Sequence, residues 1–184
     1  MSDKPFALHI TFTTYGTWLP GDKRGYVSPT QLPEGGTLPK KNLYGTEYTR
    51  NNPYTKQVAY AQQKYDTVWL NLDQAKTIAH ELITACQQRD WFIAQAAIIS
   101  NHVHVVVMQC PQDGPAVRRI LKGVTQAELS KHSGKPQRWF TKGGSNRYKF
   151  DQRAIDNAIV YVRNQEHMLV GIENMKIFIP GEAK

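Results

Sequence analysis

Residues 100 to 108 read SNHVHVVVM, and this stretch decides the fold of the chain. Successive side chains of a β-strand alternate between the two faces of a sheet, so His102 and His104 lie on one face and Val103, Val105 and Val107 on the other. A face made only of valines is typical of a strand packed against a core. The stretch therefore predicts a central strand with a buried valine face and two imidazoles on the opposite face.

Two imidazoles on one face of a strand can share a metal ion without bending the backbone, since histidine is the commonest metal ligand in proteins. A His-x-His pair can equally be structural. The metal interpretation therefore requires a further ligand, a nucleophile and a substrate surface elsewhere in the chain.

The charge of the chain is uneven. The 184 residues carry a net charge of +8, and the segment from residue 115 to 163 holds eleven basic and three acidic side chains, so it contains the whole excess. Such a concentration predicts a polyanionic partner, although a basic face that serves only solubility is an alternative. The candidate contacts in this segment are Arg118, Arg119, Lys122, Lys142, Arg147 and Arg163.

Several classes of protein are disfavoured. Cys86 and Cys110 form no Cys-x-x-Cys pattern, which argues against a zinc knuckle or a disulfide framework. The most apolar run is too short to span a bilayer, and the first residues do not resemble a signal peptide. We expect a cytoplasmic protein with no membrane partner.

The periodicity predicts one domain over residues 1–184 with a ferredoxin-like α+β architecture, in which an antiparallel sheet has helices on one face and a C-terminal helix is added. Asp73 is the expected cap of the first helix, and residues 143–146 are expected to form a turn. The expected elements, in order, are a strand at 7–14, a helix at 73–89, strands at 91–100 and from 102, a helix from about 115, a short strand at 138–141 and a last helix at 151–169.

A long insertion rich in proline, glycine and aromatic residues separates the first strand from the first helix, at about residues 15–65. Aromatic rings interleaved with cations suit stacking on unpaired bases, which makes Trp18 and Arg24 candidate nucleic-acid contacts. The alternative is that these rings only hold the insertion against the domain.

The last predicted helix places Tyr161 at the margin of its apolar stripe and Gln165 one turn further on the same side. A tyrosine oxygen can attack a phosphodiester and form a covalent intermediate. Because a phenol is almost entirely protonated at neutral pH, a divalent cation near the phosphate would assist it. Tyr161 can also be a boundary packing residue. His9, on another strand and without a motif partner, is expected to be peripheral.

Four short motifs carry a resemblance to a known family: TYGTWLPGD at 14–22 with RG at 24–25, NHVH at 101–104, LKG at 121–123 and YVRNQ at 161–165. With these motifs the chain resembles the HUH single-strand DNA transposases with one catalytic tyrosine. It is most similar to the branch associated with repetitive extragenic palindromes, and the resemblance covers nearly the whole chain.

The resemblance implies a site-specific endonuclease and strand transferase that acts through a 5′-phosphotyrosine on Tyr161. It implies that His102 and His104 hold Mg²⁺ or Mn²⁺ and that Gln165 completes the coordination. The implied partner is single-stranded DNA bearing a hairpin, and the protein could act as a homodimer. The rival interpretations are a catalytically silent nucleic-acid-binding module and a domesticated transposase that binds palindromic DNA or RNA without cutting.

Overall fold

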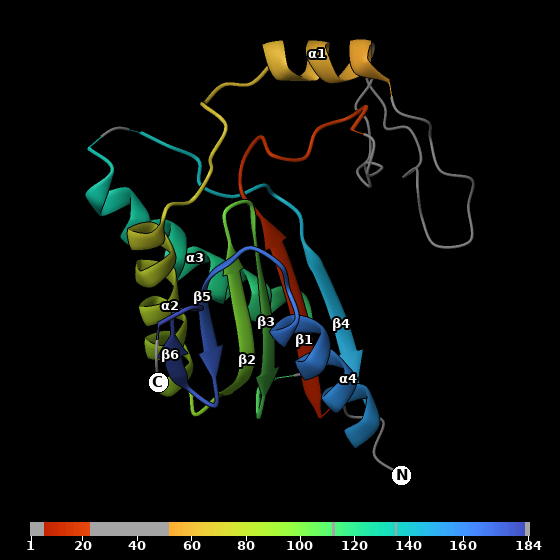
Figure 1. Cartoon of the computed structure of the whole chain (residues 1–184), viewed down its shortest axis with the longest axis vertical. Coiled ribbons are helices and arrows are strands. Elements are labelled where there is room, and N and C mark those ends of the chain that lie inside the picture. The colour runs from red at the N-terminus through yellow and green to blue at the C-terminus, as the bar shows by residue number, and fades with distance from the viewer. Residues whose placement is uncertain (1–5, 23–51, 112, 135, 183–184) are drawn as a thin grey trace. The chain divides into compact units, whose positions relative to one another are not determined.

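The computed structural model describes residues 6–22, 52–111, 113–134 and 136–182, and the structural statements below concern these residues (Figure 1). The chain divides into two compact units. One unit combines the segment up to Tyr15 with the segment from Val68 onwards, and the other runs from Gly16 to Thr67. The second unit occupies the segment predicted as an insertion, and Arg24 lies outside the described residues.

The first unit contains a six-stranded antiparallel sheet in the order β4-β1-β3-β2-β5-β6. A helix connects β1 to β2 and another connects β3 to β4, which is the ferredoxin-like arrangement. The predicted fold class is therefore confirmed, and β3 is central as expected. The strands are β1 (Ala7–Thr13), β2 (Phe92–Ile99), β3 (His102–Met108), β4 (Ser145–Lys149), β5 (Met168–Glu173) and β6 (Lys176–Phe178).

One face of this sheet packs against α2 (Leu72–Gln87) and α3 (Gly114–His132). The valines of β3 that the sequence assigned to the core lie here and are fully buried, together with apolar side chains of both helices. Figure 1 shows these two helices on one side of the sheet. The alternation of residues in β3 thus directs one set of side chains into the larger core.

The opposite face of the sheet packs against α4 (Gln152–Arg163), which contacts β2 and β3. Ile155, Ala158 and Val162 of the helix are buried against Val106 of β3 and several alanines of β1 and β2. Both histidines of the His-x-His pair belong to this face. The C-terminal helix and the two imidazoles are therefore brought to the same side of the sheet.

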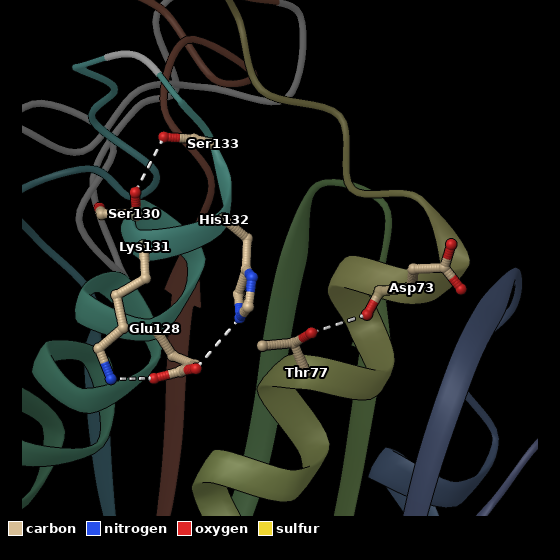
Figure 2. Close-up of polar contacts among 7 residues, drawn as sticks. All are labelled: Asp73, Thr77, Glu128, Ser130, Lys131, His132 and Ser133. Atoms are coloured by element: carbon tan, nitrogen blue, oxygen red, sulfur yellow. Dashed lines mark hydrogen bonds and ion pairs between the residues drawn. The ribbon is translucent and has the colours of Figure 1, made fainter.

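The helix boundaries correct two predictions. Asn71, not Asp73, caps α2: its side chain accepts a hydrogen bond from the backbone of Gln74, and the Gln74 side chain accepts one from Asn71 in return. Asp73 lies in the first turn, where its carbonyl accepts a hydrogen bond from Thr77 at 3.0 Å (Figure 2). The last helix ends at Arg163 rather than near residue 169.

The prediction for the C-terminal third was wrong in its strands. Residues 138–141 make only an isolated bridge, between Phe140 and Thr14, and the fourth strand is Ser145–Lys149, which includes two residues predicted as a turn. Two further strands follow α4. An edge strand such as β4 is half solvated, so it lacks the apolar alternation by which a buried strand is recognised.

The second unit contains α1 (Pro53–Ala61), which the sequence did not predict and which Asn52 caps. Gly21 is required in this unit: its φ is +82°, and a Cβ would lie 2.4 Å from the Asn52 carbonyl oxygen. The neighbouring Asp22 is buried and forms an ion pair with Lys56 at 3.1 Å. The GD pair of the TYGTWLPGD motif therefore organises the fold of its own unit.

Both cysteines are free thiols; Cys86 is buried and Cys110 is partly buried. No helix among the described residues has the length and apolarity needed to cross a membrane.

Candidate active site

The pairing of β1 with β3 assembles a polar cluster under α4. In the register of these strands Thr11 is opposite His104 and His9 is opposite Val106, so both β1 side chains lie on the same face as the two histidines of β3. The rings of His102 and His104 are 4.7 Å apart between centroids and nearly perpendicular. The predicted imidazole pair is therefore present on one face.

Hydrogen bonds orient both imidazoles of the pair. His102 Nδ1 lies 2.6 Å from Asn101 Oδ1, and because an amide oxygen only accepts, this nitrogen carries the proton. His104 Nδ1 lies 2.9 Å from Thr11 Oγ1 and 3.2 Å from His9 Nε2. Since its δ nitrogen is hydrogen-bonded, Nε2 of His104 is the ring atom available for a ligand, as in metal-binding histidines whose other nitrogen is hydrogen-bonded.

The electrostatic environment keeps His9 and His104 neutral. Burial, with smaller contributions from positive charge at His102, His9 and Arg147, lowers the pKa of His104 to about 3. Burial also lowers the pKa of His9 to about 4, with contributions from Lys149 and Arg147. At physiological pH both rings are therefore uncharged, and protons do not compete with a cation for them.

The ring of Tyr161 lies next to those of His104 and His9. Its ring centroid is 5.6 Å from that of His104 and 5.7 Å from that of His9. The following residue, Val162, is fully buried in the interface between α4 and the sheet, whereas Tyr161 is 52% exposed. The marginal position predicted from the helical period therefore presents the phenol to solvent beside the imidazoles.

Gln165 lies in a different setting from the one predicted. It follows Asn164, which caps the C-terminus of α4, so it is not on a continuing helix. Its Nε2 donates to the carbonyl of Tyr161 at 3.0 Å, and the described residues provide no hydrogen bond from it to either imidazole. Its amide oxygen is the atom that would serve a cation.

In the described part of the chain, acidic side chains do not complete the predicted donor set. Among the described residues no group of three or more histidine, cysteine, aspartate and glutamate side chains is placed to hold a metal ion. The donors predicted for this site are two imidazoles and one amide. A neutral donor set leaves the full charge of a cation for an anionic substrate.

Several basic side chains predicted as nucleic-acid contacts form hydrogen bonds or ion pairs within the protein. Lys122 donates to the carbonyl oxygens of Thr141 and Gly143, and burial, with the charges of Arg118 and Arg138, lowers its pKa to about 8. Arg118 donates to Asn146 at 3.1 Å. Arg163 pairs with Glu173 of β5 at 2.7 Å, which ties the end of α4 to the sheet.

The other predicted contacts are more accessible. Arg119, Lys142 and Arg147 are exposed in the first unit. Arg147 lies opposite His9 in the pairing of β1 with β4, on the same face as the candidate site. Trp18 is half-buried and belongs to the second unit.

His9 is a member of this site whose position the sequence did not reveal. It was expected to be peripheral, yet it is 4% exposed and its Nε2 contacts His104 Nδ1. The alternation of residues in β1 places His9 on the same face as Thr11, and this alternation is the sequence feature that could have pointed to its role. Its partner is 95 positions away, so no local motif marks the contact.

No protein-family model matches the chain, and no curated protein matches it. One solved structure, described as a REP-associated tyrosine transposase bound to a REP hairpin, is similar to the chain with 10% sequence identity and a TM-score of 0.45. The match covers 88% of this chain and 70% of that chain. At this identity and TM-score the similarity carries nothing about the activity of the present chain.

Proposed function

We propose that the protein is a metal-dependent, site-specific single-strand DNA endonuclease and strand transferase in which Tyr161 is the nucleophile. The observation that carries the proposal is the half-exposed phenol within 6 Å, between ring centroids, of the two neutral imidazoles of His9 and His104. The sequence motifs that resemble the HUH transposases support it independently. The proposed substrate is a single strand that carries a hairpin.

In the proposed reaction the Tyr161 oxygen attacks the scissile phosphorus. A phenol oxygen–phosphorus bond forms while the bond from phosphorus to the 3′ oxygen of the preceding nucleotide breaks. The phenol releases its proton to solvent, and the departing 3′ oxygen takes up a proton. Because one phosphodiester replaces another, a 3′-hydroxyl can attack the 5′-phosphotyrosine and transfer the strand without a nucleotide cofactor.

The residues that would hold the cation are His102 and His104, with Gln165 as the third ligand implied by the family resemblance. The two imidazoles fit this role, because their δ nitrogens are hydrogen-bonded and burial keeps His104 neutral. A bound Mg²⁺ or Mn²⁺ would neutralise charge on the scissile phosphate and orient it for in-line attack. Arg147 would add positive charge on the same face.

The test is covalent adduct formation with a panel of hairpin-bearing single strands in Mn²⁺. We expect the wild type to form an adduct that EDTA abolishes, and Tyr161→Phe to form none while it binds the strands with nearly unchanged affinity. Tyr54→Phe, another exposed tyrosine, is the matched control and should form the adduct normally. An adduct with Tyr161→Phe would show that the nucleophile is another residue, and a wild type that binds without any adduct would favour the silent binding module.

A further inference from the structure

Three exposed aromatic residues lie at the edge of the sheet formed by β4. In the pairing of β4 with β1, Tyr148 is opposite Leu8 and Lys149 is opposite Ala7. Phe150 and Phe6 are the next residues of the two segments, and Phe6 N donates to the Lys149 carbonyl at 2.8 Å. Tyr148 and Phe150 stack with ring centroids 6.3 Å apart and 30° between their planes. We call Phe6, Tyr148 and Phe150 the aromatic row.

Core packing does not account for the aromatic row. Its members are 60%, 39% and 54% exposed, in chain order, and neither hydrophobic cluster of the described residues includes them. The hydroxyl of Tyr148 accepts a hydrogen bond from Gly114 N at 3.3 Å, which anchors the ring at the start of α3. Single exposed aromatic residues are common on protein surfaces, but a stacked pair whose backbone is paired with a third exposed aromatic residue is an apolar patch that indicates a partner.

Positive charge surrounds this patch. Arg147 and Lys149 alternate with the rings along β4 and therefore lie on the opposite face, where Arg147 is opposite His9. Arg118 contacts Asn146, which shares the face of Tyr148 and lies two residues before it. Aromatic rings on one face of β4, with cations on both faces, suit single-stranded nucleic acid, whose bases can stack on the rings and whose phosphates can contact the cations. A second copy of β4 fits less well, because the like charges of Arg147 and Lys149 would repel each other across paired edges.

We propose that the side chains of the aromatic row stack on unpaired bases of single-stranded DNA. Arg147 and Lys149 contact the phosphate backbone of this DNA where it passes around the edge of β4 toward Tyr161. This inference rests on the proposed function and adds a binding site outside the catalytic cluster. The edge leads to that cluster because Arg147 is opposite His9, whose ring is 5.7 Å from that of Tyr161. Recognition by stacking tolerates any base, so the site would hold the strand without reading its sequence.

The test uses a hairpin-free 20-nucleotide oligo(dT) and an abasic strand of the same length, both with fluorescent labels. Binding to the full-length protein is measured by anisotropy in EDTA, so that cleavage does not contribute. We expect the wild type to prefer oligo(dT) over the abasic strand. Phe150→Ala should weaken oligo(dT) binding by about fivefold or more, and Phe6→Ala/Phe150→Ala should remove most of the preference.

Trp69→Ala is the matched control, because Trp69 is equally exposed in the same unit but lies far from β4 in the sequence. It should leave both affinities unchanged, and Phe150→Tyr should retain the wild-type preference. Circular dichroism establishes that the variants fold. The dependence of affinity on salt should be the same in wild type and double variant, since no phosphate contact is removed.

The inference is overturned if the double variant keeps the wild-type preference for bases over the abasic strand. It is also overturned if the double variant loses self-association in sedimentation while its DNA affinity is unchanged, since the row would then be an interface between copies. Either result leaves the proposed function in place. A wild type that binds hairpin-bearing strands but neither hairpin-free strand also overturns the inference and leaves the proposed function in place. A wild type that binds neither class of DNA would contradict the proposed function itself.

Discussion

His9→Phe is the substitution that most directly tests how the candidate site is built. Phenylalanine keeps an aromatic ring at a buried position but removes Nε2, which lies 3.2 Å from His104 Nδ1. Thr11 Oγ1, at 2.9 Å from the same nitrogen, is retained in this variant. The substitution therefore removes one of the two groups that hold the His104 ring, and it leaves Tyr161 and the three proposed cation ligands in place.

The expected effect follows from the number of these contacts. Loss of a hydrogen-bonding partner behind a metal-binding histidine costs about 10–100-fold in metal affinity or activity. Because the Thr11 contact remains, we expect the lower end, about tenfold, for His9→Phe, and a similar loss for Thr11→Val. The double variant should approach about 100-fold. One lost hydrogen bond lowers the free energy of unfolding by about 1 kcal/mol, so the variants should fold.

Two measurements separate orientation of His104 from simple packing. The first is the Mn²⁺ concentration that gives half-maximal adduct formation, and the second is direct Mn²⁺ binding, followed by electron paramagnetic resonance without DNA. Both midpoints should rise about tenfold. His80→Phe, at an exposed histidine of α2, is the control and should change neither. If His9→Phe lowers the unfolding free energy but leaves both midpoints within twofold of wild type, His9 only fills space and the reasoning is refuted.

Three further predictions concern stability, measured by urea unfolding. The side chain of Gln95 is fully buried, and both its amide nitrogen and its amide oxygen lack a hydrogen-bond partner among the described residues. Gln95→Met should therefore raise the free energy of unfolding by about 1–3 kcal/mol. A lower free energy of unfolding in this variant would indicate that a water bridges the amide in the wild type. Gly144→Ala should lower the free energy of unfolding by at least about 1–3 kcal/mol, because φ is +153° and a Cβ would lie 2.6 Å from the Thr11 carbonyl oxygen. Gly123→Ala is the control and should not be destabilising, because a Cβ there meets nothing within 4 Å. Lys122 has a pKa of about 8 in the folded protein, below the ordinary value of 10.5, so the unfolded chain binds more protons than the folded protein between these two pH values. The free energy of unfolding of the wild type should therefore rise relative to that of Lys122→Met from pH 8 to pH 10. A constant difference between the two proteins would contradict the lowered pKa.

The sequence determined those features that depend on periodicity within one element. The alternation of residues 102 to 107 was enough to predict a central strand with valines in the core and two histidines on the other face. The helical period of residues 152 to 163 was enough to place Tyr161 at the margin of an apolar stripe. The predicted order of strand, helix, two strands, helix, strand and helix indicated the ferredoxin-like fold, because few topologies satisfy it, although the fourth strand was assigned to the wrong residues.

Tertiary structure decided the features that depend on which elements meet. His9 and His104 touch because β1 pairs antiparallel with β3 in one register, and a contact across 95 positions leaves no mark in either local pattern. The fourth strand lies at residues 145 to 149 because β1 supplies its hydrogen-bonding partner, whereas its own side chains alternate between solvent and a half-covered face. The last helix ends at Arg163 because the chain must return to form β5 beside β2, a pairing that overrides the apolar residues continuing to Leu169.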